Sequence, residues 1–235
     1  MTVSELQKAL KAAGFDPGPI DGIAGARTRA AVRAFQIRHG LSADGIAGVQ
    51  TLIALVGPVK SLATNTSDRG DVLMPWMTEA GRLMGLKEVS GTGNSHQIMG
   101  WAQDLDLDYA GDDVPWCGLF MAHVISATLP DEPLPANPLG ARQWLKFGRS
   151  VAPQLGAVLV FWRGSEDGWS GHVALYVGED ADTYHVLGGN QSDAVTITRI
   201  LKDRLLGARW PLGVDPAGQR LSADGAQMSV STNEA

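Results

Sequence analysis

Cysteine is the scarcest reactive residue in this chain: among 235 residues, Cys117 is the single example. One thiol excludes an intramolecular disulfide, and it also excludes metal sites built from several cysteines. Nor is there an EF-hand-like spacing of acidic residues. We therefore expect neither a metal nor a cofactor, and Cys117 needs an explanation other than cross-linking.

Long apolar runs and an excess of positive charge are also missing. No run approaches the roughly 20 apolar residues of a membrane-spanning helix. The opening MTVSELQKALKAAG lacks the apolar segment of a secretory signal peptide. A formal net charge of −6 argues against a nucleic-acid partner. We expect a monomer made in the cytoplasm, without membrane insertion, that needs another agent to release it before it can act outside.

The charged residues are distributed unevenly along the chain. Residues 1–58 carry six Lys or Arg and four Asp or Glu, whereas the remainder carries 13 and 21. The two parts therefore differ in sign, and the first part tolerates a polyanionic surface better than the second.

The first 58 residues contain an internal repeat. DGIAGARTRAAV at 21–32 matches DGIAGVQTLIAL at 44–55 in seven of twelve positions. Asp-Gly favours a turn with positive φ, and each turn leads into an amphipathic helix. A further helix is predicted in SELQKALKAAGF, and we expect Ile23 and Ile46 of the two turns to pack inward.

These patterns carry a resemblance. The string LQxxLxxxGF, followed by two copies of DGxxGxxT and by FQ between them, is similar to the small peptidoglycan-binding domain of bacterial and phage cell-wall hydrolases. The resemblance covers about residues 3–57 and implies a three-helix bundle that binds cell-wall material. The alternative is that the repeat merely builds a compact helical domain, and the two interpretations are compatible.

Composition sets the remaining boundaries. Residues 59–72 are rich in Ser, Thr, Asn and Asp without apolar periodicity, which predicts a linker. Residues 213–235 are predicted to be a disordered tail. Between them, 73–212 forms one domain, and 1–58 forms the helical peptidoglycan-binding domain.

Helices come first in the 73–212 domain and strands follow. Clustered strands joined by short loops predict an α+β fold with an antiparallel sheet. The expected helices are 75–86, one near 97–104, and one that starts at 115–117 and runs to about 129; 141–148 is expected to be a short helix or turn. The expected strands are 157–162, 172–178, 183–189, 195–200 and 207–211.

Cys117 lies in DDVPWCGLF, where a helix is expected to start. Pro115 favours the first helical position, so Cys117 falls in the first turn. Free N–H groups and the helix dipole stabilise an anion there, which lowers a thiol pKa. A free cysteine is also often a small buried hydrophobe, and position alone does not choose between these interpretations.

A thiolate nucleophile needs a histidine base that a third polar group orients. His172 opens the predicted strand HVALYVG beside a glycine-containing loop. If 172–178 and 183–189 form a hairpin, Asn190 lies near His172 and can orient its ring. His185 falls roughly 13 Å further along the strand, so His172 is the preferred base. The other histidines are less suited to this role: His39, His96 and His123.

A second resemblance covers nearly all of 73–212. The strings VPWCGLFMAHV, ARQWLKFG, FWRGSEDGWSGHVALYVGED and VLGGNQSDAVTITR resemble the NlpC-type and CHAP superfamily of papain-like cysteine hydrolases, in a phage-type subgroup. The resemblance implies Cys117 as nucleophile, His172 as base and Asn190 in the third polar position. Gln191 competes for that third position, because relatives use several polar residues there.

Other residues near the motifs are candidates for substrate contact: Trp116, Asp113, Trp169 and Gln191. A groove lined by tryptophans suits sugar or peptide, although core packing is an alternative explanation for a tryptophan. One residue departs from the resemblance: Ala157 stands where many relatives carry Asp before a strand. We interpret that Asp as structural.

The sequence thus predicts a modular peptidoglycan hydrolase resembling phage endolysins. Its first domain would hold the wall, and its second would cut an amide bond in the peptide part of peptidoglycan. The bond is left open between the sugar–peptide link and a bond within the stem peptide. Two rival hypotheses are a non-catalytic wall-binding or phage structural protein built on the same scaffold, and a cysteine acyltransferase.

Overall fold

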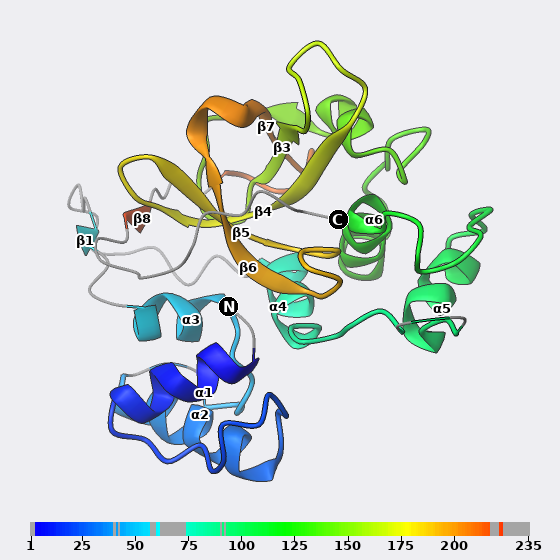
Figure 1. Ribbon diagram of the computed structural model, residues 1–235. Helices are drawn as coiled ribbons and strands as arrows, with labels where there is room; N and C mark the ends of the chain where they lie inside the picture. The colour runs from blue at the N-terminus through cyan, green and yellow to red at the C-terminus, as the bar shows by residue number, and fades with distance from the viewer. Residues whose placement is uncertain are drawn as a thin grey trace.

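A computed structural model gives the arrangement of the chain (Figure 1). It describes residues 3–39, 41, 43–56, 60–61, 74–89, 91, 93–216 and 221–222. Helices and a mostly antiparallel sheet make up these residues, so the fold is α+β. Across the described ranges, no helix combines the length and apolarity that a bilayer crossing requires.

Three helices form the first region: α1 (Val3–Ala12), α2 (Ala26–Arg38) and α3 (Val49–Val56). They pack around one small apolar core, to which all three contribute. The fully buried members are Leu6, Leu10, Ala31, Val32, Phe35 and Leu52. This region lies at one end of the molecule, with α3 nearest the sheet (Figure 1).

The first repeat turn is built around the buried side chain of Gln7. Its Nε2 donates to Asp21 Oδ1 at 2.9 Å, to the Ile23 carbonyl at 3.1 Å and to Thr28 Oγ1 at 3.1 Å. Its Oε1 accepts the N–H of Gly22 at 3.0 Å. Both ends of this amide are satisfied by the turn that it holds, as a buried polar group requires.

The second turn repeats this arrangement around Gln36. Its Nε2 donates to Asp44 Oδ1, the Ile46 carbonyl and Thr51 Oγ1, at 2.8, 2.8 and 3.0 Å. Its Oε1 accepts the N–H of Gly45 at 2.9 Å. The repeated Asp, Gly and Thr of the sequence motif therefore serve the fold through a buried glutamine.

One sequence expectation about these turns is wrong. Ile23 is 65% exposed, and Ile46 is only partly buried. Each isoleucine directs its backbone carbonyl at the glutamine. The hydrogen bonds fix the backbone of the turn, and the apolar side chain is left on the outer side.

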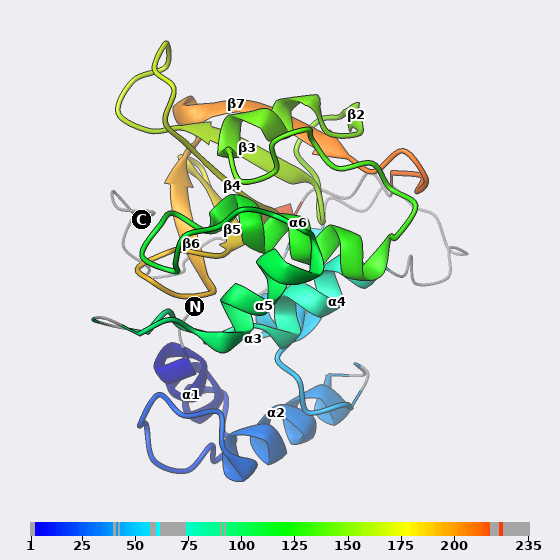
Figure 2. The ribbon, with the colours of Figure 1, turned by 90° about the vertical axis from the view of Figure 1, so that its right-hand side faces the viewer.

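The second region begins with helices. These are α4 (Pro75–Arg82), α5 (His96–Asp104), α6 (Cys117–Thr128) and the 3₁₀ turn η1 (Ala141–Lys146). The predicted helices at 75–86, near 97–104 and from 115–117 to about 129 are confirmed, with ends shifted by a few residues, and the short helix or turn predicted at 141–148 is the 3₁₀ turn η1. In Figure 2, α4, α5 and α6 lie together between the sheet and the first region.

Within the described residues the sheet contains eight strands, three of which are only two residues long. They are β1 (Lys60–Ser61), β2 (Arg149–Ser150), β3 (Val158–Trp162), β4 (Gly171–Glu179), β5 (Thr183–Gly188), β6 (Thr196–Leu201), β7 (Leu205–Trp210) and β8 (Leu221–Ser222), with η2 (Lys202–Arg204) before β7. The order is β1-β8-β4-β3-β7-β2, and β5 joins β4 to β6. All five predicted strands are present, whereas the short strands β1, β2 and β8 were not predicted.

The predicted linker and tail fall mostly outside the described residues. Within them, β1 and β8 pair with each other, and β8 meets β4 at Glu179. The predicted domain boundaries stay predictions.

The main core lies between α6 and the sheet. Helix α6 is apolar on nearly every side and is buried along most of its length, as expected of a helix enclosed by other elements. Strands β3, β4 and β5 are buried on both faces. This packing positions the first turn of α6 against the beginning of β4.

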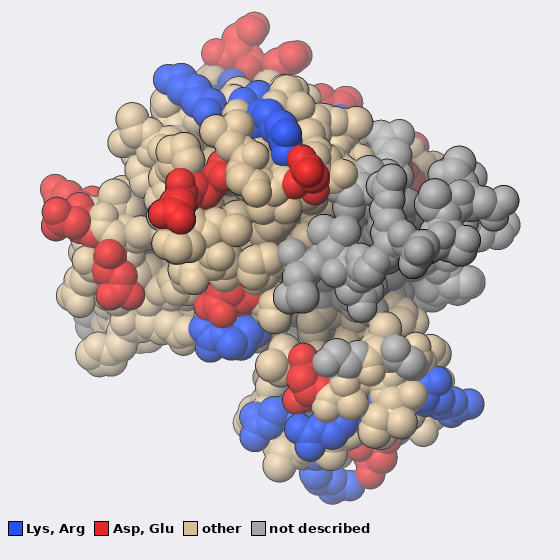
Figure 3. All heavy atoms as spheres, turned by 180° about the vertical axis from the view of Figure 1, so that it is seen from behind, with Lys and Arg blue, Asp and Glu red and all other residues tan. Residues whose placement is uncertain are grey.

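The two regions carry their charges differently. On the face seen in Figure 3, basic side chains gather over the helical region, and acidic side chains are spread over the larger one. This agrees with the opposite signs of the two parts of the sequence.

Candidate active site

Cys117 is the first residue of α6, as its position after Pro115 predicts, and its side chain is buried. The thiol is within hydrogen-bond reach of the backbone N–H groups of Val173 and Gly118. Since Val173 is the third residue of β4, the contact places the sulfur beside the start of that strand. Its sequence neighbour there is His172.

The electrostatics of the thiol differ from the sequence expectation. Burial raises the pKa of Cys117, and the N–H groups of Val173 and Gly118 together with the charge of Arg163 lower it by less. The helix start was expected to lower the pKa, but loss of solvent is the larger effect for a fully buried thiol. Ionisation of Cys117 therefore needs a proton acceptor inside the site.

His172 is fully buried at the start of β4, where it pairs with Phe161 of β3. Its Nε2 lies 3.1 Å from Oε1 of Gln191. The side chain that contacts the ring is therefore Gln191, the alternative in the sequence analysis, rather than the expected Asn190.

The orientation of the Gln191 amide fixes the tautomer of His172. Gln191 Nε2 donates to the Thr196 carbonyl at 2.5 Å and to Thr196 Oγ1 at 3.3 Å. The amide oxygen is then the atom that faces the ring, so the ring Nε2 carries the proton. In the neutral ring, the basic lone pair consequently lies on Nδ1, which is buried.

A tight turn explains why Gln191, and not its neighbour, reaches the ring. Asn190, Ser192 and Asp193 adopt left-handed backbone conformations with φ of 55°, 55° and 58°. Asn and Asp tolerate this region better than most residues. The N–H of Gln191 donates to the Ala194 carbonyl at 2.9 Å, so Asn190 shapes the turn that points Gln191 at His172.

Close backbone approach at glycines brings these elements together. A Cβ on Gly189 would lie 2.6 Å from Phe120 Cβ and from the Trp116 ring. A Cβ on Gly118 would lie 2.4 Å from the carbonyl oxygens of Pro138 and Leu139. Only glycine allows the end of β5 and the 138–139 segment to lie this close to the start of α6.

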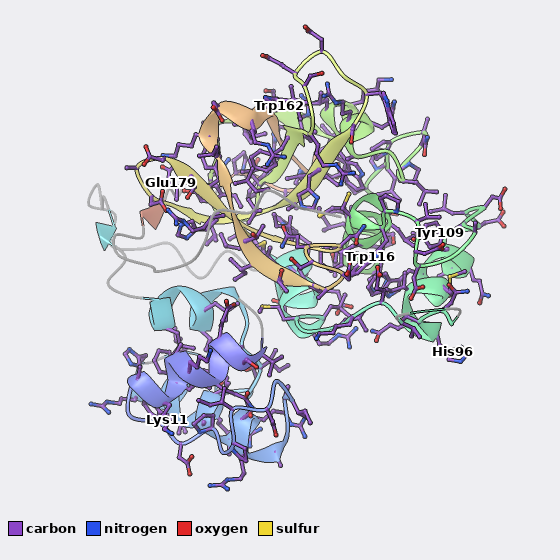
Figure 4. The ribbon with its side chains drawn as sticks, in the orientation of Figure 1. Lys11, His96, Tyr109, Trp116, Trp162 and Glu179 are labelled. Atoms are coloured by element: carbon purple, nitrogen blue, oxygen red, sulfur yellow. The ribbon has the colours of Figure 1, made fainter. Side chains whose placement is uncertain are left out.

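Two predicted substrate residues occupy different environments. Trp116 is fully buried, and its Nε1 donates to Glu88 Oε2 at 3.1 Å (Figure 4). It is a core residue, so its expected place in an open groove is corrected. Trp169, by contrast, is 92% exposed in the loop between β3 and β4.

The two acidic residues before Cys117, Asp112 and Asp113, also differ in burial. Asp112 is buried, and its Oδ2 accepts the N–H groups of Val89 and Ser95 at 3.0 and 2.7 Å. Asp113 is exposed, which is compatible with the substrate contact expected of it. Asp112 therefore holds the backbone N–H groups of Val89 and Ser95 beside the segment that leads to Cys117.

The remaining histidines of this region have other partners. His185 pairs with Gly178, six positions along β4 from His172 or about 20 Å. Its Nε2 lies 2.9 Å from Asp180, and burial lowers its pKa although Asp180 opposes this. His123 stacks on Trp101 and contacts Glu79.

His96 begins α5 on the outer side of the molecule (Figure 4). Among the described residues, no group of three or more His, Cys, Asp or Glu side chains is placed to hold a metal ion.

Sequence reasoning missed three contributors: the N–H of Val173, the side chain of Thr196 and the charge of Arg163. Thr196 and Val173 carry no signal of their own in the sequence. Arg163 follows a predicted strand that leads to His172, which was a usable signal.

Comparison with known proteins addresses the first region. Residues 2–55 match the family described as "Putative peptidoglycan binding domain". Spore cortex-lytic enzymes recorded for Bacillus cereus are 47% identical to this chain over 58 residues, which is 25% of this chain and 22% of theirs. The chain thus spans about a fifth of the length of the curated relatives it matches. No solved structure gives a significant match.

Proposed function

We propose that the protein is a peptidoglycan hydrolase that cuts an amide bond in the peptide part of the bacterial cell wall. Cys117 is the nucleophile, His172 the base, and Gln191 the residue that positions the base. One observation carries the proposal: the His172–Gln191 hydrogen bond lies next to the Val173 N–H that contacts the Cys117 thiol.

The tautomer of His172 assigns a role to each of its ring nitrogens. Gln191 holds the proton on His172 Nε2, so Nδ1 is the atom that accepts the proton of Cys117. The raised pKa of the buried thiol means that the thiolate forms by this transfer, when the substrate is bound, rather than by ionisation into solvent.

The reaction then follows acyl transfer. The thiolate attacks the amide carbonyl, and N–H groups of the first turn of α6 stabilise the oxyanion. The C–N bond breaks as His172 returns the proton to the leaving amine. Water, deprotonated by His172, hydrolyses the thioester and restores the thiol.

The placement of these residues supports a papain-like catalytic domain. A nucleophile at a helix start, a base at a strand start and a polar residue after the next strand are the arrangement that the resemblance implies. The three helices of the first region, as a peptidoglycan-binding bundle, would hold the enzyme on the wall.

The direct test measures lysis of purified peptidoglycan by the wild type and by Cys117→Ala, Cys117→Ser and His172→Ala. We expect the lysis rate of each variant to be lower than that of the wild type by about a thousandfold or more, the approximate scale for loss of a nucleophile or its base. Lysine 146 is exposed in the same region, so Lys146→Gln serves as a folded control with wild-type activity. Lysis by Cys117→Ala at the wild-type rate would refute the mechanism.

The second candidate is a non-catalytic wall-binding protein, and the burial of Cys117 is the observation that favours it. Iodoacetamide reports on a single site, because the chain has one cysteine. Alkylation of the native protein that depends on His172 supports the enzyme. A thiol that reacts only after unfolding, together with absent lysis, supports the scaffold.

Mass spectrometry of the released fragments identifies the bond. A free sugar end indicates cleavage of the sugar–peptide link, and a shortened stem peptide indicates an endopeptidase.

A further inference from the structure

Arg163 follows the last residue of β3 and continues the pairing with β4. Trp162 pairs with Gly171 and Phe161 with His172. The N–H of Arg163 donates to the Ser170 carbonyl at 3.2 Å, one step further toward the loop. Arg163 therefore lies at the base of the 163–170 loop, within two positions of the residue opposite the proposed base.

The pleat of the sheet gives the direction of its side chain. Residues two apart on a strand share a face, and directly opposed residues of two strands point to the same side. Phe161 and its partner His172 thus share one face, and we expect Arg163, the first residue beyond β3, to follow the same alternation. The charge of Arg163 also reaches the Cys117 thiol, where it lowers the pKa. Both observations put the guanidinium on the side of the sheet that carries the proposed catalytic pair, close enough for its charge to act on the thiol.

Trp162 points to the other face. Its ring packs under Arg204, with 5.6 Å between the guanidinium carbon and the ring centroid, and its Nε1 donates to the Asp203 carbonyl. The Trp162 ring is therefore engaged by the 203–204 segment, and we expect the Arg163 side chain to point to the opposite side.

The loop that begins at Arg163 is held in one position. Arg142 of η1 donates to three of its carbonyls: those of Ser165, Glu166 and Ser170, at 2.8, 2.7 and 2.8 Å. The loop, yellow-green at the top of Figure 1, presents the exposed ring of Trp169. A rigid support and a solvent-exposed tryptophan suit a binding element.

Within the described residues, the Arg163 guanidinium forms no ion pair. Arg142 is engaged by backbone carbonyls, and Glu166 and Asp167 of the same loop are not within ion-pair distance of Arg163. The surrounding domain is acidic. A half-buried arginine that has no ion-pair partner among the described residues and whose charge acts on the nucleophile is therefore a candidate binding site for an anion.

We propose that Arg163 binds a carboxylate of the substrate, so that the enzyme selects peptides with a free carboxylate beside the scissile amide. The inference rests on the proposed function and refines its substrate class. The planar guanidinium fork matches a carboxylate, and stem peptides carry several carboxylates. Trp169 forms the outer part of the same binding wall.

The test uses peptides that differ by one functional group. Once the cleaved bond is known, a stem peptide containing it is made with every carboxylate free, and then with each carboxylate amidated in turn. We expect one amidation to reduce kcat/KM of the wild type by about tenfold to a hundredfold, mainly through KM, the scale of a charge-assisted hydrogen bond. Arg163→Gln should cleave both forms with nearly equal kcat/KM, and Arg163→Lys should keep part of the discrimination.

Controls separate the outcomes. Lys146→Gln removes an exposed positive charge whose hydrogen-bond partner is Gln143, and it should discriminate like the wild type. A wild type that cleaves all forms equally, or an Arg163→Gln that discriminates as well as the wild type, overturns the inference and leaves the proposed function intact. A wild type that cleaves no form overturns both.

If Arg163 affected only the pKa of the Cys117 thiol and did not bind substrate, a different pair of results would be expected. Arg163→Gln would then shift the pH dependence of Cys117 alkylation upward while discrimination between free and amidated peptides persisted. That pair of results refutes substrate binding by Arg163, and an unchanged melting temperature shows that the variant is folded.

Discussion

The two regions of the molecule each use buried glutamines, but for different purposes. Gln7, Gln36 and Gln191 are 1%, 2% and 2% exposed. All three donate through Nε2 to a nearby backbone carbonyl, which belongs to a repeat turn for Gln7 and Gln36 and to the first residue of β6 for Gln191. They differ in the partner of the amide oxygen.

In the helical region the oxygen accepts a backbone N–H from the same turn, whereas in the larger region it accepts from the His172 ring. A buried amide with both ends on backbone stabilises a fold. One that shares its oxygen with a titratable side chain also sets where that side chain holds its proton. The chemistry of the partner, more than the residue type, therefore separates a structural glutamine from a positioning one.

Among the substitutions that test this comparison of glutamines, Gln191→Ala is expected to have the largest effect on kcat. It removes the acceptor for His172 Nε2–H, so the ring loses both its orientation and its fixed tautomer, and kcat should fall by about a hundredfold. Kinetics on a soluble peptide measure this. Gln191→Asn is the matched variant, because it keeps the amide and shortens its reach. An unchanged kcat in a folded Gln191→Ala would mean that the third glutamine is structural like the other two.

Gln36→Ala should change stability and wall binding instead. It leaves the Gly45 N–H and the partners of Nε2 without their hydrogen bonds, at a cost of about 3 kcal/mol to unfolding of the helical region. Urea unfolding and co-sedimentation with cell walls measure both consequences. Cleavage of a soluble peptide should stay at the wild-type rate, and its loss would contradict the separation between the regions.

The smallest effect is expected from Thr196→Val. The substitution removes Oγ1 but keeps the backbone carbonyl that holds Gln191 Nε2. One weak hydrogen bond is lost, so kcat should fall severalfold, corresponding to about 1 kcal/mol. A decrease as large as that of Gln191→Ala would show that the hydroxyl, and not the carbonyl, orients the amide.

Much of the fold follows from local patterns. Helix α6 begins after Pro115 as its sequence predicts, and the order of helices and strands agrees with apolar periodicity and turn residues. The β4–β5 hairpin pairs Leu175 with Leu187, one residue from the register that a regular turn at 179–182 gives, and the register shifts between Tyr176 and Gly178. That register brings residues near 190 toward His172.

The errors share a cause. Trp116 was expected to line an open groove and is buried, whereas Ile23 was expected to pack inward and is exposed. In each case the direction of a side chain is set by hydrogen bonds to distant residues, such as Glu88 for Trp116 and Gln7 for the Ile23 carbonyl. Local propensity carries no information about those partners.

The sequence by itself determined that a lone cysteine starts a helix, that His172 starts a strand, and that a polar pair at 190–191 ends the next strand. Only the tertiary structure decided which of the pair touches the ring, and that burial raises the pKa of Cys117. The physical reason is that the directions of these two side chains depend on the backbone angles of the turn that follows β5. Asn190 has a left-handed conformation, which points the next residue, Gln191, at the ring. Packing around the turn imposes these angles, and the local sequence does not.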